Sequence, residues 1–253
     1  ISGTPREISL APLAFSSTSR PIGRIIDCSP EVRMNPPLSA NEHILYSINF
    51  NMGTDWWTGG FADYPVGSDG DYRLEWGWRL LPEPFSGHGF HLGGTNRSDD
   101  LFMFMKKRIT GLLPGTEYLF GVEVTFATNA PRGCAGAGGA PGESVYLKAG
   151  ISVEEPQPIH TDGSWRMNID KGDQGNDGKD ARVIGDIANS STMCSGTPYE
   201  MKTVTGIPVA RTVRVSAEGS VWLMIGTDSG FEAMTSLYYA RVLLLGKPVA
   251  IGL

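Results

Sequence analysis

The sequence is short of charge, of basic clusters and of long apolar segments. Charged residues make up 19% of its 253 residues, and the formal net charge is −6. Phosphate binding needs clustered Lys and Arg, and the chain offers only Lys106, Lys107 and Arg108 in one place. We therefore expect no nucleic-acid partner. No apolar run approaches the ~20 residues that cross a bilayer, so we expect a chain that does not span a membrane.

Cysteine is also scarce. It occurs at positions 28, 134 and 194 without Cys-x-x-Cys spacing, which disfavours zinc and redox motifs. The chain starts at Ile1 without Met or a signal-like segment, so we expect an amino terminus that was processed or shortened, with any export signal already removed. If the protein is exported, we expect it to be extracellular, at the cell surface or in the periplasm. In that setting Cys134 and Cys194 are candidates for a disulfide, because a bridge would rigidify their Gly/Ser-rich loops. Three reduced cysteines are the alternative.

Glycine and proline, in contrast, are abundant, with 33 Gly and 17 Pro. Between them lie short stretches of alternating apolar and polar residues, which are typical of strands, and no long stretch has the period of a helix. We predict about ten to twelve strands in an all-β, two-sheet antiparallel sandwich, jelly-roll-like in architecture. The predicted strands include residues 44–50, 72–80, 101–109, 118–126, 145–151, 165–169, 181–187, 199–204, 212–217, 221–226 and 237–245.

Composition divides the chain into two parts. Residues 1–40 are rich in Pro and Ser, which predicts an extended N-terminal arm. Residues 41–253 are expected to form a single sandwich domain. Within it, residues 130–142 form a glycine-rich connection between two predicted strands, and such backbone is either shaped for a purpose or anchored.

Two local patterns predict turns and loops. Pro and Gly at 113–116 predict a tight turn that joins strands 101–109 and 118–126 into a hairpin. The segment His88-Gly-Phe-His91 could bring two imidazoles near a metal ion, but its glycines favour a polar loop.

The acidic loops are candidate ligand sites. Asp170, Asp173, Asn176 and Asp177 stand among glycines and offer the oxygen donors that Ca²⁺ prefers. Asx turns explain the same residues without a metal. If the acidic loops meet at one end of the sandwich, they form a cation or polar-ligand site. The other polar candidates in these loops are Asn96, Asp99, Asp100, Asp228 and Glu232.

Residues 55–65 combine aromatic side chains with two glycines and a proline, which predicts a loop. Aromatic rings of such loops can stack on sugars while Asp hydrogen-bonds the hydroxyl groups. In the alternative, the two adjacent tryptophans close the end of the core. The candidate ligand-binding residues here are Trp56, Trp57, Phe61, Asp63 and Tyr64.

Six motifs resemble a family of uncharacterised exported bacterial proteins, over residues 44–242. They are Trp57-Thr-Gly-Gly-Phe-Ala-Asp-Tyr-Pro65, Asn96-Arg-Ser-Asp-Asp-Leu-Phe-Met-Phe104, Thr125-Phe-Ala-Thr-Asn129, Gly133-Cys-Ala-Gly-Ala-Gly-Gly-Ala-Pro-Gly-Glu-Ser-Val-Tyr-Leu-Lys-Ala-Gly150, Asn168-Ile-Asp-Lys-Gly-Asp-Gln174 and Gly226-Thr-Asp-Ser-Gly-Phe-Glu232. The resemblance implies export and brings no catalytic residue. More loosely, the strand order resembles non-catalytic carbohydrate-binding jelly rolls.

Three functional hypotheses follow from these patterns. The leading one is an exported, non-catalytic protein that binds a polysaccharide or another extracellular polymer, with Ca²⁺ as a structural ion. The first alternative is a self-assembling surface or fibre subunit, a homo-oligomer whose arm adds a strand to the next copy. The second is a polysaccharide-active enzyme with paired carboxylates, Asp99 or Asp100 with Asp170 or Asp228.

Overall fold

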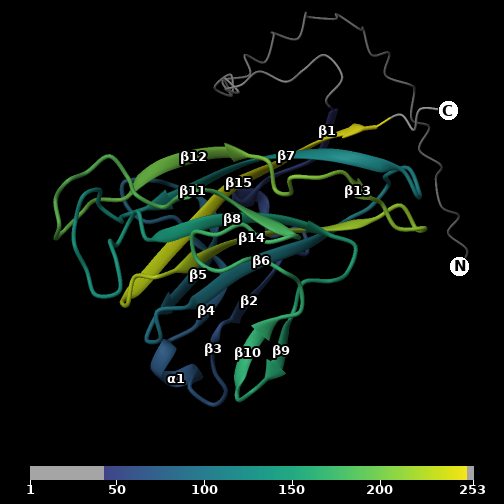
Figure 1. Cartoon of the computed structure of the whole chain (residues 1–253). Helices are drawn as coiled ribbons and strands as arrows, with labels where there is room; N and C mark the ends of the chain where they lie inside the picture. The colour runs from purple at the N-terminus through teal and green to yellow at the C-terminus, as the bar shows by residue number, and fades with distance from the viewer. Residues whose placement is uncertain (1–42, 250–253) are drawn as a thin grey trace, which may run out of the picture. The chain divides into compact units, whose positions relative to one another are not determined.

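The computed structural model describes residues 43–249, and the predicted arm of residues 1–40 lies outside them (Figure 1). Almost all regular structure is β, and every strand pair is antiparallel. The described helices are a 3-10 turn, η1 (Phe50–Met52), and a four-residue helix, α1 (Asp69–Tyr72). Among the residues described, no helix is long and apolar enough to cross a membrane.

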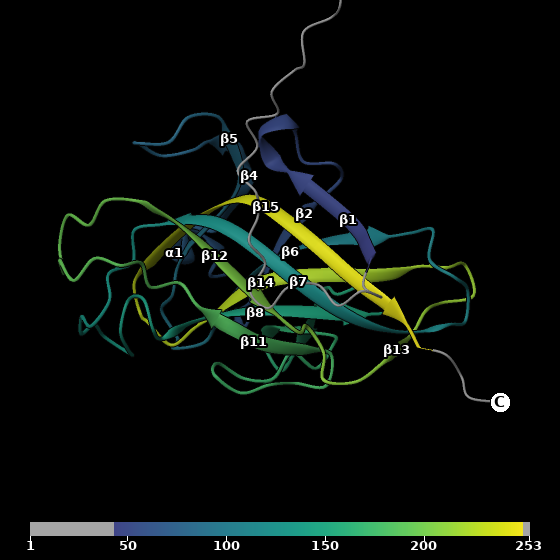
Figure 2. The same cartoon turned by 90° about the horizontal axis from the view of Figure 1, so that it is seen from above.

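Two large sheets form the sandwich. The first has the order β12-β7-β15-β5-β4, with β1 added on β15 and β13 on β7. The second has the order β11-β8-β14-β6-β2, and Figure 2 shows strands of the first sheet passing over it. The first sheet comprises β1 (His43–Asn49), β4 (Glu75–Leu80), β5 (His88–Thr95), β7 (Glu117–Thr128), β12 (Glu200–Gly206), β13 (Val213–Arg214) and β15 (Met234–Pro248). The second comprises β2 (Thr58–Ala62), β6 (Leu101–Ile109), β8 (Val145–Ser152), β11 (Ala181–Asp186) and β14 (Val221–Ser229). The predicted two-sheet antiparallel sandwich is confirmed.

Alternation along the strands builds the core between the two sheets. On β7 the residues Phe120, Val122, Val124 and Phe126 are buried, and each lies two positions from the next. Successive side chains of a strand point to opposite faces, so this spacing directs all four to the inner face. Burying one such side chain contributes about 1.5–3 kcal/mol, which makes this layer the main stabilising element of the fold.

A third, small sheet and the covering loop, residues 168–180, lie on the outer face of the second sheet. The small sheet is β3-β10-β9, with β3 (Tyr64–Pro65), β9 (Pro158–Thr161) and β10 (Ser164–Met167), and Figure 1 shows it below the two large sheets. Beneath the cover, Phe102, Phe104 and Met224 form a second apolar cluster with Ile169. The second sheet is therefore buried on both faces along part of its surface.

Several local predictions were wrong. The predicted strand 72–80 begins at Glu75, because α1 ends at Tyr72 and Arg73 is left-handed, with φ 49°. Residues 58–62 form β2 instead of a loop, and His88–Thr95 form β5 inside the first sheet. Glycine is unfavourable in strands, so its presence in these segments made the sequence look like loops. Pairing with neighbouring strands nevertheless makes them strands.

The predicted hairpin at 113–116 is also wrong. The turn exists, since the Thr116 amide donates to the Leu113 carbonyl at 3.2 Å. Its two strands, however, enter different sheets: β6 pairs with β14 and β2, whereas β7 pairs with β15, β12 and β13. Turn residues fix the reversal of the chain, but they do not choose the partner of each strand.

Candidate functional site

A cluster of buried charges lies between the second sheet and its covering loop. Lys148 of β8 and Asp228 of β14 both point to the outer face. Leu147, one position before Lys148, and Ile225, three positions before Asp228, belong to the inner core, and odd spacings along a strand point to opposite faces. The Lys148 ammonium lies 3.0 Å from the Asp228 carboxylate, and both side chains are fully buried. Asp228 therefore lies within β14, and the prediction that it belongs to an acidic loop was wrong.

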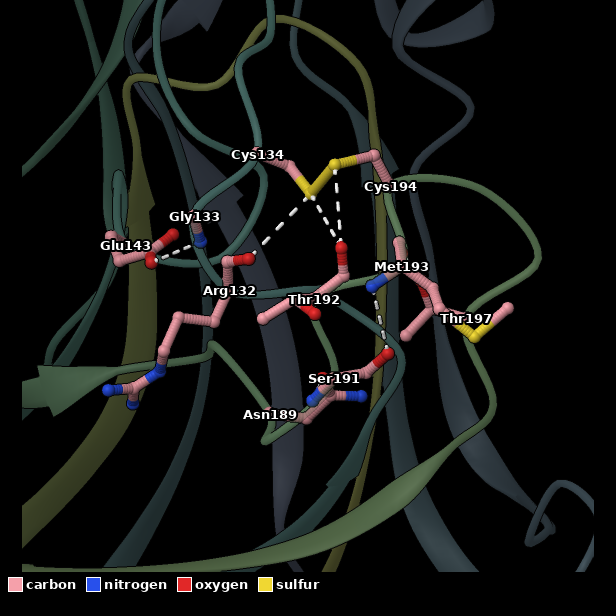
Figure 3. Close-up of a disulfide and its surroundings, with 10 residues drawn as sticks. All are labelled: Arg132, Gly133, Cys134, Glu143, Asn189, Ser191, Thr192, Met193, Cys194 and Thr197. Atoms are coloured by element: carbon pink, nitrogen blue, oxygen red, sulfur yellow. Dashed lines mark hydrogen bonds between the residues drawn. A yellow bond between two sulfur atoms is a disulfide. The ribbon is translucent and has the colours of Figure 1, made fainter.

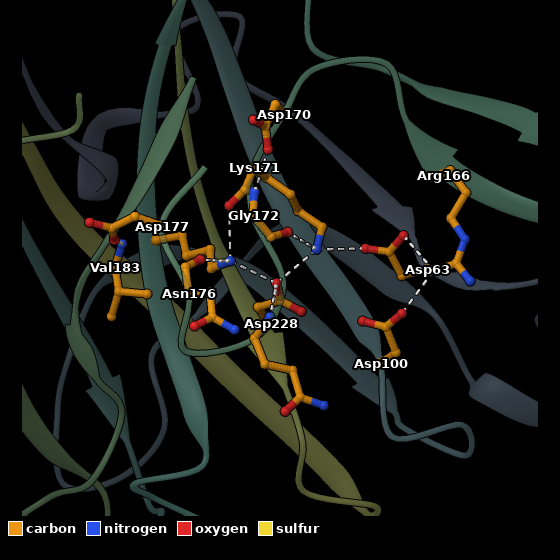
Figure 4. Close-up of polar contacts among 12 residues, drawn as sticks. Asp63, Asp100, Arg166, Asp170, Lys171, Gly172, Asn176, Asp177, Val183 and Asp228 are labelled. Atoms are coloured by element: carbon orange, nitrogen blue, oxygen red, sulfur yellow. Dashed lines mark hydrogen bonds and ion pairs between the residues drawn. The ribbon is translucent and has the colours of Figure 1, made fainter. Parts of the chain in front are cut away.

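Lys171 of the covering loop completes the cluster (Figure 4). Its ammonium lies 2.7 Å from Asp228 and 2.8 Å from Asp63, which follows β2. On the side toward solvent, the Arg166 guanidinium of β10 contacts Asp63 at 3.0 Å and Asp100 at 2.8 Å. Ion pairs thus connect β8 and β14 with β10, with the covering loop, and with Asp63 and Asp100 at the ends of β2 and β6. They fasten the covering layer to the second sheet.

The charges in this cluster balance. Asp63, Asp100 and Asp228 place carboxylate oxygens within 4.8 Å of one another, close enough to share a metal ion. Three cationic side chains, those of Lys148, Lys171 and Arg166, already contact these carboxylates. Buried charge needs neutralisation, and here the Lys171 ammonium supplies it between Asp63 and Asp228.

Burial shifts the pKa values of the cluster. It raises the pKa of Asp100 to about 6, although the hydrogen bond from Arg166 acts in the opposite direction. It also lowers the pKa of Lys148, against the attraction of Asp228. Asp100 and Arg166 line a hollow of about 360 Å³ together with Asp173. The solvent side of the cluster is therefore accessible, whereas Asp228 is not.

The predicted calcium ligands are engaged in the fold of their own loop. Asp170 accepts hydrogen bonds from the Gly172 and Lys179 amides, both at 3.0 Å. Asp177 accepts from the Val183 amide at 2.9 Å and from Arg182 at 2.7 Å. The Asn176 carbonyl accepts from Lys148, and Asp173 is exposed beside the hollow. The bond from the Gly172 amide to Asp170 is an Asx turn, the alternative that the sequence left open. The other bonds join residues that are farther apart along the chain.

The glycine-rich segment 130–142 is anchored rather than free. Cys134 and Cys194 form a disulfide, as expected, and it joins this segment to the loop before β12 (Figure 3). The Arg132 amide also donates to the Ser191 carbonyl at 2.7 Å. At Gly138, φ is 67° and a Cβ atom would collide with the Gly230 carbonyl. Glycine is needed here for the close approach of two backbones.

Three polar candidates lie beside this anchored segment and outside the ion cluster. Asn96 is buried, and its amide donates to the Ser229 and Phe231 carbonyls at 2.7 and 3.1 Å. Asp99 is exposed, and its carbonyl accepts from Gln174 at 2.6 Å. Glu232 is exposed, and its amide donates to the Ala137 carbonyl. The acidic loops do converge, but their contacts are chiefly with one another.

The aromatic candidates of residues 56–64 divide into buried and exposed members. Trp57 is only 2% exposed, packs edge-on against Phe50 and donates to the Tyr46 hydroxyl at 3.0 Å. Tyr64 belongs to a third, smaller cluster of buried apolar residues, and the half-buried Phe61 packs against that cluster. Trp56 is 87% exposed and adopts a left-handed backbone with φ 62°. One tryptophan of the adjacent pair therefore fills the core, and the other faces solvent.

Two further tryptophans are exposed on β4, which contacts η1, the element that precedes Trp56 in the chain. Trp76 and Trp78 of the edge strand β4 are 44% and 46% exposed. Trp78 donates to the Phe50 carbonyl at 2.6 Å and stacks on His88 with ring centroids 4.0 Å apart. Trp76 stacks on Phe90 and lies on Gly59 of β2, at the open side of the sandwich where β4 and β2 approach. We call Trp56, Trp76 and Trp78 the aromatic strip.

The two histidines of β5 cannot share a metal ion. His88 stacks on Trp78, whereas the His91 ring lies 3.0 Å from the Ser236 hydroxyl and near Tyr238. They are three positions apart in a strand, so they point to opposite faces. The prediction of a polar loop at this place was wrong, because residues 88–95 form β5. The opposite directions of the two imidazoles argue against a shared metal ion independently of that prediction.

Sequence reasoning missed the cations of the cluster and two members of the aromatic strip. Lys148 carried a signal, since it is the only charged residue in the otherwise apolar strand Val145–Ser152, and a buried lysine needs a partner. Trp76 and Trp78 lie within the predicted strand 72–80, but their exposure depends on β4 being at the edge of the sheet. The sequence of one strand does not show whether that strand lies at the edge or in the middle of a sheet.

No protein-family model matches the chain, and no curated protein matches it. Solved structures that resemble it include β-sandwich carbohydrate-binding modules. One, from work on the promiscuous specificity of modules from the β-sandwich superfamily, is 13% identical with a TM-score of 0.36, and the match covers 76% of this chain and 58% of that chain. The CBM22-1 xylan-binding domain of Xyn10C from Paenibacillus barcinonensis is 10% identical, with coverage of 85% and 100% and a TM-score of 0.36. The mannan-recognising module TmCBM27 is 12% identical, with coverage of 81% and 98% and a TM-score of 0.36.

Proposed function

We propose that this protein is an exported, non-catalytic module that binds a polysaccharide through the aromatic strip. The observation that carries the proposal is the exposure of three indoles, Trp76 and Trp78 on the edge strand β4 and Trp56 on the connection from η1 to β2. Solvent-exposed tryptophans gathered in one region of a protein surface mark interaction sites. Indole faces bind the C–H faces of sugars by dispersion and through the ring quadrupole.

The position of the strip fits a long ligand better than a small one. It lies on the edge strand β4 and on the connection from η1 to β2, and the bond from Trp78 to Phe50 holds β4 to η1, after which that connection begins. A chain of sugars can contact several such rings at once, whereas an enclosed pocket would limit the ligand to one end of the chain. The Asp55 carboxylate beside Trp56 is exposed; Lys107 and Tyr46 contact its Oδ2 atom, and its Oδ1 atom can accept from the hydroxyl groups.

Export is supported by the Cys134–Cys194 disulfide, since such bonds persist in oxidising compartments. A hydrolytic function is less compatible with the geometry. Asp100 and Asp228 are close, but Asp228 is fully buried and held by Lys148 and Lys171. A glycosidase needs both carboxyl groups to reach the sugar. The alternative of assembly through residues 1–40 depends on residues outside those described.

The test is binding of the full chain to a panel of soluble polysaccharides, including xylan, mannan and mixed-linkage glucan, measured by affinity electrophoresis and calorimetry. We expect binding to at least one of them, weakened tenfold or more by W56A, W76A or W78A. W222A removes a half-buried indole of β14 outside the strip and serves as the matched control. Absence of binding to every polysaccharide, or unchanged binding by all three strip variants, would refute the proposal.

Calcium is tested in the same experiment. Binding and thermal unfolding are measured with Ca²⁺ and with a chelator. Lys171 and Arg166 already neutralise Asp63, Asp100 and Asp228, and Asp170 and Asp177 of the acidic loop accept hydrogen bonds within the protein. We therefore expect the chelator to leave the melting temperature unchanged. A lower melting temperature after chelation would instead assign a structural ion to the acidic loop.

A further inference from the structure

The edge strand β4 has a sequence that is complementary to itself. Within residues 43–249, β4 pairs with β5 along Glu75 to Leu80, without a register shift, and with no other strand. Its central residues read Glu-Trp-Gly-Trp-Arg, symmetric about Gly77 in side-chain type and opposite in charge at the two ends. An antiparallel partner centred on Gly77 would place Glu75 opposite Arg79, and Trp76 opposite Trp78.

We propose that β4 is the contact between two copies of this chain, which pair antiparallel about a two-fold axis at Gly77. This inference goes beyond the proposed sugar binding and does not depend on it. A two-fold contact uses the same surface on both copies, so each favourable pair occurs twice. The two-fold pairing would make two Glu75–Arg79 contacts and two Trp76–Trp78 contacts between the copies.

The charges and the exposure of the β4 side chains support a second copy of the chain as the partner of this strand. Glu75 and Arg79 lie on one face of β4, because their charged groups approach to 2.7 Å within one chain, and both are exposed. Trp76, Trp78 and Leu80 alternate with them and are exposed as well. Opposite charges and aromatic rings directly across an antiparallel pair are each stabilising. The self-pairing therefore satisfies both faces of the strand.

The opposite edge of the same sheet provides a contrast. There β12 carries Lys202, which bonds to Asp186, and the exposed Thr203 and Thr205, beside one exposed apolar residue, Met201. Charged and polar side chains on an edge strand oppose pairing between sheets. The exposed side chains of β4 are two indoles, a leucine and one ion pair that is complementary to itself. None of these side chains opposes pairing of β4 with a matching strand.

In the paired state, Trp76 of one copy would neighbour Trp78 of the second copy. The aromatic strip would then continue across the two-fold axis as a row of four indoles. A contact centred on one short strand is small, so we expect a dimer that depends on concentration.

The test is sedimentation velocity of the full chain from micromolar to near-millimolar concentration. The wild type should shift from monomer to dimer. In E75R the paired positions are both Arg, and in R79E they are both Glu, so each variant should dissociate at least tenfold more readily. The double variant E75R/R79E restores opposite charges and should dimerise again.

An equimolar mixture of E75R and R79E is the decisive sample. Across the axis, each Arg of one variant then meets a Glu of the other, and the mixture should recover a dimer that neither variant forms alone. Circular dichroism and urea unfolding verify that the variants remain folded. A wild type that stays monomeric throughout, single variants that dimerise like the wild type, or a mixture that fails to recover the dimer would each overturn the proposal.

Discussion

The Lys148 ammonium and the Asp228 carboxylate face each other at 3.0 Å between two adjacent strands, and neither is exposed to solvent. Lys148 also donates to the Lys171 and Asn176 carbonyls, at 2.9 and 3.1 Å. This one side chain therefore holds the covering loop, with its predicted calcium ligands, against the second sheet.

Replacing Lys148 should destabilise the fold strongly. In K148M, Asp228 loses one of its two buried cations, and removing one partner of a buried pair costs about 3–5 kcal/mol. Urea unfolding followed by fluorescence measures the change. K179M, which removes an exposed lysine of the same loop, is the matched control and should change the free energy of unfolding by less than about 0.5 kcal/mol. Equal effects of the two substitutions would contradict the buried role of Lys148.

The disulfide should stabilise the protein, because it closes a loop and so restricts the unfolded chain. Cys134 and Cys194 are 60 residues apart in sequence, and loss of such a bond costs about 2–5 kcal/mol. We expect C134A, C194A and the double variant to lose similar amounts, because each removes the same bond. Reductant should lower the urea midpoint of the wild type and leave the double variant unchanged. A midpoint of the wild type that ignores reductant would argue against the bridge.

The sequence predicted the architecture better than the partners of each strand. Alternation in residues 118–126 identified an inward-facing strand, because its period of two is a local property. The failures at 101–126 and 88–95 concern pairing, which depends on residues more than 100 positions away, such as β14 for β6.

The candidate site shows the same division. Asp63, Asp100 and Asp228 were identified as polar candidates, and the structure brings them together. Their cationic partners come from three different elements, so no sequence spacing connects them. Trp56 and Trp57 are adjacent and chemically identical, yet one is 87% and the other 2% exposed. Only the fold decides which of them meets solvent.

The stability of the protein should depend on pH through Asp100. Burial raises the pKa of Asp100 to about 6 in the folded chain, above its ordinary value of 3.8. The folded state therefore binds this proton more tightly than the unfolded state. The resulting stabilisation is present below about pH 4 and is lost as the pH rises through about 6.

The variant D100N keeps a neutral side chain at every pH and removes this dependence. We expect D100N and the wild type to be similar in stability near pH 4, and D100N to be the more stable near pH 7. Urea unfolding at intervals across this range measures the difference. Stability curves that run parallel from acid to neutral pH would show that Asp100 does not titrate in this window.

Gly59 connects the packing of the open side to the proposed binding function. A Cβ atom at Gly59 would collide with the Trp76 indole, whereas one at Gly121 would lie at an ordinary 3.6 Å from Leu245. We therefore expect G59A to displace Trp76 and to cost about 1–3 kcal/mol, as overpacking does, while G121A is tolerated. If Trp76 contributes to the sugar contact, G59A should also weaken polysaccharide binding, measured by affinity electrophoresis under conditions where both variants are folded. Binding by G59A that equals binding by G121A would separate Trp76 from the ligand and restrict the proposed site to Trp56 and Trp78.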